Sequence, residues 1–137
     1  MKSFYEMSQQ VNNKRVSYTA VVLSTAEQAR LVDQYRHLIP ADWEVVAHHM
    51  TINMGPAVNG PAATLVDEPF TLKVHSFASD NKVMAVGVET DAPSTNATKH
   101  ITLAVNRKGG GKPFHSNQLV KWEPVAPFEI HGSVQEV

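Results

Sequence analysis

A short motif of histidine and threonine occurs twice in the chain. His49 and Thr51 flank a single residue, and so do His100 and Thr102, about fifty positions further on. Both copies lie where apolar and polar residues alternate, which is typical of a half-buried strand. Residues two apart on a strand point to the same face, so each histidine shares a face with its threonine. Two imidazoles that meet across a cleft can act as a general base and a general acid.

A cyclic phosphodiester suits such a pair of half-sites. One imidazole takes a proton from water, and the other gives a proton to the departing ribose oxygen. The threonine hydroxyls donate hydrogen bonds to the non-bridging phosphate oxygens, where charge builds in the transition state. A single histidine-x-threonine would be unremarkable among seven histidines. Two copies in the same phase of two alternating strands favour the catalytic interpretation.

The five histidines outside the two motifs are not expected to be catalytic. His48 precedes His49 and should point to the opposite strand face, where packing or a supporting role suits it better than catalysis. A zinc site from His48, His49 and His100 is a weaker alternative, because adjacent strand positions face apart and no His-Glu-x-x-His spacing exists. Structural or solvent roles are expected for His37, His75, His115 and His131.

A basic, glycine-rich segment at residues 107–117 follows the second motif directly. Glycines let backbone amides approach a phosphate, although the spacing is not that of a Walker A loop. A solvated turn is an equal alternative for Arg107 and Lys108. Phe114 lies in this polar segment and is suited to stacking on a base. The side chains predicted to contact substrate are Lys112, Phe114, Ser116 and Asn117.

Length, net charge and cysteine content exclude several classes of protein for this chain. The 137 residues fit one domain, and a formal net charge of -1 argues against a broad basic surface for long nucleic acid. The absence of cysteine excludes disulfides, thiolate catalysis and cysteine zinc sites. The sequence has no apolar run long enough to predict a membrane span, and residues 1–6 lack the apolar stretch of a secretory signal. We therefore expect a cytoplasmic protein with no membrane association and no stable protein partner.

The elements that must position the motifs follow from periodicity and turn signals. Strands are predicted at residues 16–23, 43–53, 70–77, 83–90, 99–106 and 128–137. A capped helix fills residues 24–40, and a short helix is expected at 116–120. Residues 1–15 read as an arm or a short helix. Hairpins mixed with helices predict an α+β fold in a single domain that spans residues 1–137.

The paired motifs resemble the two-histidine (2H) phosphoesterase superfamily. Ile52 and Leu103 supply the apolar residue that many members carry after the threonine. The Lys112-Pro113 segment before Ser116 is similar to the branch that contains RNA ligase-like enzymes and the cyclic phosphodiesterase module of tRNA ligases. The resemblance implies two pseudo-symmetric lobes of antiparallel sheet, with outer helices, around a central cleft.

The resemblance also implies the roles of the motif residues. His49 and His100 would be the acid–base pair, Thr51 and Thr102 would hold the phosphate, and neither a metal nor a cofactor would be required. The leading hypothesis is a metal-independent phosphodiesterase whose substrate is the 2′,3′-cyclic phosphate end of RNA or a related nucleotide phosphodiester. Two alternatives stay open: an enzyme of the phage anti-defence type that degrades cyclic oligonucleotide second messengers with the same four residues, and a non-catalytic module that binds nucleotides or RNA ends.

Overall fold

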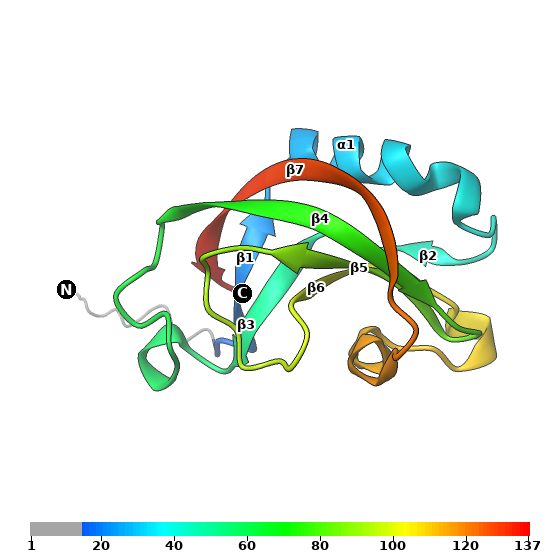
Figure 1. The fold of residues 1–137 in the computed structure, drawn as a ribbon. Coiled ribbons are helices and arrows are strands. Elements are labelled where there is room, and N and C mark those ends of the chain that lie inside the picture. The colour runs from blue at the N-terminus through cyan, green and yellow to red at the C-terminus, as the bar shows by residue number, and fades with distance from the viewer. Residues whose placement is uncertain (1–14) are drawn as a thin grey trace.

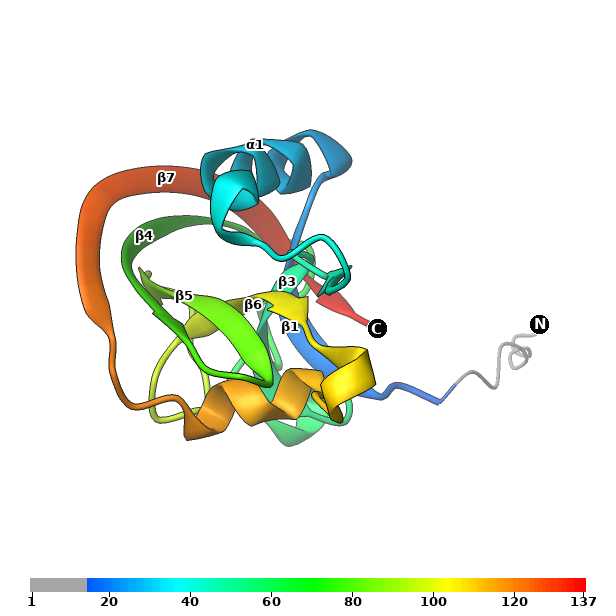
Figure 2. The same cartoon turned by 90° about the vertical axis from the view of Figure 1, so that its right-hand side faces the viewer.

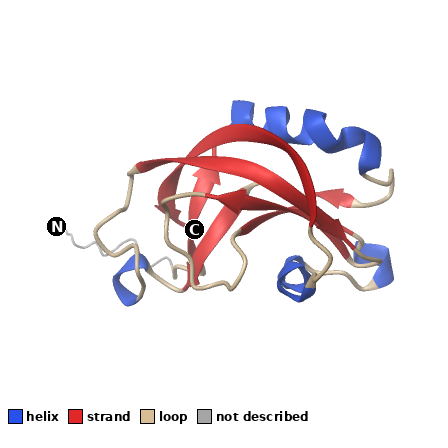
Figure 3. Ribbon diagram, viewed as in Figure 1, coloured by secondary structure: helices blue, strands red, loops and turns tan. Residues whose placement is uncertain are grey.

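An antiparallel sheet and one α-helix make up residues 15–137, the part of the chain that the computed structural model describes (Figure 1, Figure 3). The predicted α+β class is therefore confirmed. The predicted arm at residues 1–15 lies outside the described residues except for Arg15. The elements are β1 (Tyr18–Leu23), α1 (Thr25–Tyr35), η1 (Arg36–Leu38), β2 (Glu44–Val45), β3 (His49–Met54), η2 (Ala57–Asn59), β4 (Pro69–Ser79), β5 (Val83–Glu89), β6 (His100–Val105), η3 (Arg107–Gly109), η4 (Pro113–Gln118) and β7 (Glu123–Glu136), where η denotes a 3-10 helix.

The sheet closes on itself. Its strand order is β2-β6-β3-β1-β7-β4-β5, and β5 also pairs with β6. The ring of strands thus runs without a break from β6 through β3, β1, β7, β4 and β5 back to β6. The two pseudo-symmetric lobes expected from the family resemblance are not confirmed by this continuous pairing.

The two motif strands, β3 and β6, are antiparallel neighbours that meet at Met50 and Ile101. Both of these side chains are fully buried in the core. Residues on either side of such a pair point to the opposite face of the sheet. The register therefore sets His49 beside Thr102, and Thr51 beside His100, on the face away from the core. The two motifs are related by a local two-fold arrangement about this single residue pair.

The predicted strand at residues 43–53 is wrong in one respect, because it is interrupted. Its first part, β2, pairs with the far end of β6, and β3 begins only at His49. Between them Ala47 adopts a left-handed conformation, with φ 44°. The Ala47 amide donates to the Thr102 carbonyl at 2.9 Å, whereas Met50 faces Ile101. This strand therefore carries extra residues relative to β6, which is a bulge, and strict alternation of side chains fails there.

The helix α1 covers the β7 side of the sheet (Figure 1). Ser24 caps its N-terminus, since its hydroxyl accepts from the Glu27 amide at 3.2 Å. Glu27 in turn accepts a hydrogen bond from the His131 amide of β7 at 2.7 Å. Near the other end, buried Tyr35 stacks on Phe77 of β4 with ring centroids 5.6 Å apart. α1 thereby closes one side of the main core.

A second, smaller apolar cluster holds η4 against the sheet. Leu119, just after η4, packs with Val83 of β5 and Val105 of β6, and Trp122 packs against the same group. The Trp122 indole N–H donates to the Leu119 carbonyl at 3.2 Å. In Figure 2, η4 lies on the side of the sheet opposite α1. The short helix predicted at residues 116–120 is therefore present, but it begins earlier, at Pro113, and is a 3-10 helix.

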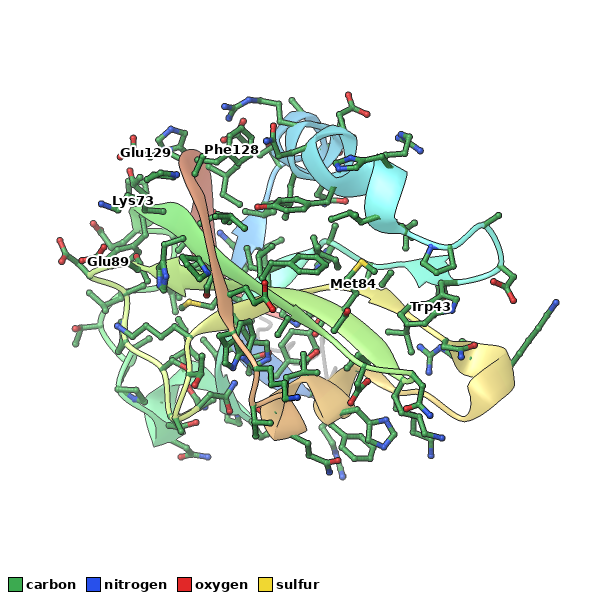
Figure 4. All side chains as sticks on the ribbon, turned by 45° about the vertical axis from the view of Figure 1, so that its right-hand side comes forward. Trp43, Lys73, Met84, Glu89, Phe128 and Glu129 are labelled. Carbon is green, nitrogen blue, oxygen red and sulfur yellow. The ribbon has the colours of Figure 1, made fainter. Side chains whose placement is uncertain are left out.

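The remaining surface of β4, β5 and β7 is polar. Lys73 of β4 lies in register between Glu89 of β5 and Glu129 of β7, and Figure 4 shows the three side chains grouped at one side of the molecule. The Lys73 ammonium is 3.5 Å from the Glu89 carboxylate, and both side chains are exposed. Such a pair contributes little stability. Within residues 15–137, no helix is long and apolar enough to cross a membrane.

Candidate active site

A cavity of about 680 Å³ opens on the face of β3 and β6 that is turned away from the core. All four motif side chains line it, as the sequence predicted. Its walls come from β1, β2, β3 and β6, from the loop at residues 91–98, and from η3 and η4. The lining residues are Tyr18, Glu44, Val45, Val46, His48, His49, Thr51, Met54, Thr95, Asn96, His100, Thr102, Arg107, Pro113, Phe114 and Asn117.

His100 is held in one tautomer by the backbone. Its Nδ1 lies 2.7 Å from the Thr98 carbonyl oxygen, which can only accept, so Nδ1 carries a proton. The side chain is only 8% exposed. Burial lowers the pKa of His100, and the bond to the Thr98 carbonyl partly offsets this. The neutral ring therefore has its lone pair on Nε2, the arrangement that a general base requires.

His49 has a different environment on the opposite strand. Its ring stacks on Tyr18 of β1, with centroids 4.6 Å apart and an interplanar angle of 27°. Its Nδ1 lies 3.0 Å from the Nδ1 of His48. Burial, and then the charges of His48 and His100, lower the pKa of His49 to about 4. The influence of His100 agrees with the presence of both imidazoles in one cavity.

The position of His48 differs from the sequence prediction. Alternation placed it on the face opposite His49, yet it lines the same cavity and contacts the His49 ring. The reason is the bulge at Ala47, which removes His48 from the regular part of β3. The zinc alternative gains no support, because residues 15–137 contain no group of three or more His, Asp or Glu side chains arranged to hold a metal ion.

The two threonines differ in how they are held. The Thr102 hydroxyl lies 2.8 Å from the hydroxyl of Ser116 in η4. Ser116 is 1% exposed, so its side of this contact is buried, while Thr102 faces the cavity. At Thr51 the backbone carbonyl accepts from the Ser94 hydroxyl at 2.8 Å, which attaches the loop at residues 91–98 to β3. Both threonine side chains line the cavity.

The four predicted substrate contacts divide into two pairs. Phe114 and Asn117 line the cavity, and the Phe114 ring is 54% exposed. Lys112 is exposed at the start of η4 and does not line this cavity. Ser116 is buried behind Thr102, so it reaches a ligand in this cavity through that hydroxyl. It also borders a side hollow of about 260 Å³ next to His100.

The glycine-rich loop forms a turn that uses its own amides. The amides of Gly109 and Gly111 both donate to the Asn106 carbonyl, at 3.1 and 2.8 Å. The amide of Gly110 donates to the Arg107 carbonyl at 3.0 Å. Amides that are bonded within the loop cannot also cradle a phosphate. These three amides are therefore not free to approach a phosphate. Of the two residues for which a solvated turn was an equal alternative, Lys108 is exposed outside the cavity, whereas Arg107 lines it.

Sequence reasoning missed several residues of the cavity wall. Thr95 and Asn96 are placed there because the Thr95 amide and hydroxyl both donate to the Ile52 carbonyl, at 2.7 and 3.0 Å. Glu44 of β2 also lines the wall, and its carboxylate holds Arg107 in an ion pair at 2.7 Å. The composition of residues 91–98 indicates a turn, and nothing in it predicts attachment to β3. Pairing of β2 with β6, which brings Glu44 near Arg107, also has no local sequence signal.

The site and the comparisons define the class of the protein. A family model described as the fungal tRNA ligase phosphodiesterase domain matches residues 24–135, a span that includes both motifs. This family is 2H phosphoesterase-like, as the paired motifs predicted. The chain belongs to the family of fungal tRNA ligase phosphodiesterase domains. No curated protein and no solved structure matches the chain.

Proposed function

We propose that the protein hydrolyses the 2′,3′-cyclic phosphate end of RNA, or a related nucleotide phosphodiester, by metal-independent acid–base catalysis with two histidines. The observation that carries this proposal is the register of β3 and β6, which brings both histidine–threonine pairs into one cavity. Membership in a phosphodiesterase family supports the reaction class. Two proton-transfer groups and two hydroxyl donors suit the opening of a cyclic phosphodiester.

His100 is the general base in this proposal. Its Nδ1–H is engaged by the Thr98 carbonyl, so the neutral ring offers Nε2 to a water molecule. The water oxygen attacks phosphorus while its proton passes to Nε2. The bond from phosphorus to one ribose oxygen breaks, and that oxygen receives a proton from His49. Each proton transfer of this kind typically contributes about 10²–10⁴-fold in rate.

Thr51 and Thr102 bind the phosphate oxygens that gain charge. A threonine hydroxyl has one proton to donate. If Ser116 donates to Thr102 across their 2.8 Å contact, the Thr102 proton stays free for the phosphate. Phe114 at the cavity wall offers a face for the nucleobase, and Asn117 offers an amide beside it.

The test is hydrolysis of an RNA oligonucleotide that ends in a 2′,3′-cyclic phosphate, with and without EDTA. We expect wild-type turnover in both conditions, and a loss of about 10²–10⁴-fold in kcat for His49→Ala and for His100→Ala. His75→Ala is the matched control, since His75 is exposed on β4 and lies outside the cavity. Full activity in either motif variant would contradict the assignment.

The substrate panel also separates the alternatives. Cyclic di- and trinucleotides and 2′,3′-cyclic mononucleotides are assayed beside the RNA end, because the same four residues would act on each of them. Turnover of cyclic oligonucleotides in preference to the RNA end would replace the proposed substrate. Calorimetric binding of the RNA end without turnover during long incubation would favour a binding module.

A further inference from the structure

His48 gives one catalytic histidine a partner that the other lacks. Its Nδ1 lies 3.0 Å from the Nδ1 of His49, and the two rings meet edge to face at 79°, with centroids 5.2 Å apart. The corresponding Nδ1 of His100 faces the Thr98 carbonyl. A carbonyl can only accept a hydrogen bond, whereas an imidazole nitrogen can accept or donate. The two catalytic rings are thus held by chemically different partners.

A 3.0 Å contact between two ring nitrogens requires one proton between them. If His49 held that proton on Nδ1 as a neutral ring, its Nε2 would be a lone pair. His100 already has a lone pair on Nε2, so the cavity would then contain two bases and no acid. If His48 donates instead, His49 carries its own proton on Nε2, where it can be given to a leaving group.

We infer that His48 is a positioning residue that shares a proton with His49, so that His49 presents Nε2–H to the departing ribose oxygen as the general acid. This inference rests on the proposed function and deepens it, because it assigns the two proton-transfer roles. The bulge at Ala47, which turns His48 into the cavity, then has a functional consequence.

The proton balance requires one added proton on the pair. The His48–His49 pair then holds three N–H protons: one on each Nε2 and one between the Nδ1 atoms. As the bond from phosphorus to ribose oxygen breaks, the Nε2 proton of His49 moves to that oxygen. The shared proton passes to the Nδ1 of His49, and both rings become neutral. The proton taken from water by His100 is later lost to solvent, and the pair regains one from solvent.

The electrostatics of the free cavity disfavour an added proton on His49, so the pair takes up this proton together with the phosphate anion. Burial lowers the pKa of His49 to about 4, so this ring by itself is a poor holder of an added proton at neutral pH. Sharing spreads the charge over two rings, and a bound phosphate anion favours the charged form. The other titratable side chains that line the cavity are Tyr18 of β1, Glu44 of β2, His100 of β6 and Arg107 of η3.

The first test uses a leaving group that needs no proton. In 2′,3′-cyclic phosphorothiolates, sulfur replaces the ribose oxygen that departs, and a thiolate leaves without general-acid help. We expect His48→Ala to lower kcat about 10-fold or more on the oxygen substrate, with KM nearly unchanged, and to approach the wild-type rate on the sulfur substrate. His49→Ala should behave alike, whereas His100→Ala stays slow on both substrates.

Two comparisons make this test decisive. His48→Asn restores a donor to the Nδ1 of His49 but cannot relay a proton, so its kcat on the oxygen substrate should lie between those of His48→Ala and the wild type. His75→Ala controls for the loss of a histidine elsewhere. An equal loss on both substrates in His48→Ala, or no loss on the oxygen substrate, would overturn the inference.

The second test does not depend on activity. Long-range ¹⁵N–¹H correlation spectra report which ring nitrogen of each histidine carries a proton. We expect Nδ1–H for His100 and Nε2–H for His49 in the wild type, and loss of the His49 preference in His48→Ala. A wild-type His49 protonated on Nδ1 alone would overturn the inference. The expected tautomers in a protein that hydrolyses none of the substrates would refute the proposed function and leave the His48–His49 pairing intact.

Discussion

The two motifs are alike in sequence and unlike in their surroundings. His100 is fixed by a backbone carbonyl, and His49 by another imidazole. Thr102 is held by the buried Ser116 hydroxyl, while the Thr51 backbone is held by the loop at residues 91–98. These differences arise from segments outside the repeat. They give two equal half-sites unequal roles in the proposed reaction.

Removal of the Ser116 hydroxyl should weaken the proposed binding of phosphate by Thr102. We expect Ser116→Ala to lower kcat/KM about 10-fold, which corresponds to roughly 1.4 kcal/mol, because Thr102 loses the contact that fixes its rotamer. The double variant with Thr102→Val should be no worse than Thr102→Val alone, since Ser116 acts through that hydroxyl. Ser79→Ala, at the exposed end of β4, is the control. Additive losses in the double variant would show that Ser116 acts independently.

The pH dependence of kcat/KM should report the buried His100. As the base, His100 must be unprotonated, and burial lowers its pKa from the ordinary value of 6.5. Activity should therefore persist as the pH falls below 6.5 and be lost only as the pH passes through the lowered pKa. Initial rates at subsaturating substrate between pH 4 and 9 measure this. An acidic limb centred at or above pH 6.5 would contradict the assignment of His100 as the base.

At the scale of elements, the site depends on where η4 is anchored. Gly111 is buried two residues before the start of η4, and a Cβ there would collide with the carbonyl oxygen of Lys82. Its amide donates to the Asn106 carbonyl, so the backbone cannot move away without losing a bond. Leu119 fixes the other end of η4 in the small apolar cluster. Phe114 and Asn117 are held in the cavity wall between these two anchors.

Gly111→Ala should therefore displace η4. We expect the free energy of unfolding to fall by about 1–3 kcal/mol, because the added methyl group forces backbone apart in a packed region. KM for the proposed cyclic-phosphate substrate should rise as Phe114 moves. Urea denaturation and steady-state kinetics measure the two effects. Lys108→Ala, an exposed change in the same turn, should alter neither quantity, and an equally stable Gly111→Ala protein would show that the loop can yield.

The sequence predicted those elements whose signal is local. Alternation located β3 and β6, and the cap at Ser24 located α1. The sequence did not reveal the bulge at Ala47. Glycine or asparagine at this position would indicate a left-handed φ, but alanine has no such preference. For the same reason the sequence prediction placed His48 on the wrong face. Residues 91–98 join the site through backbone acceptors on β3, which no side-chain pattern encodes.

At the scale of the whole molecule, the closed ring of strands buries His100 and partly buries His49. The α+β class follows from the order of elements. Closure of the sheet requires β5 to pair with β6 as well as with β4, and the register between strands distant in sequence is set by tertiary packing. Closure leaves β6 with neighbours on both edges, so His100 is almost fully covered. Folding therefore takes two imidazoles out of water, and global stability becomes linked to their protonation.

The free energy of unfolding should fall in mild acid, because the unfolded chain exposes the His49 and His100 rings to protonation. Burial lowers the pKa values of His49 and His100, so below pH 6.5 the unfolded chain binds protons that the folded chain does not. The stabilisation is present above pH 6.5 and is lost as the pH falls through the folded pKa, which for His49 is about 4. For His49 alone the effect is on the order of 3 kcal/mol. Urea denaturation at pH values from 4 to 7.5 measures it.

The matched variants decide whether these two rings are the cause. A His49→Gln, His100→Gln double variant lacks both titrations, so its free energy of unfolding should change much less between pH 6.5 and 4 than that of the wild type. Exchange of His75 and His131 for glutamine should leave the wild-type slope in place, because both residues are exposed to water in the folded protein. Equal slopes in the wild type and the His49, His100 variant would mean that neither ring is buried in its neutral form, and the electrostatic basis of the site would have to be abandoned.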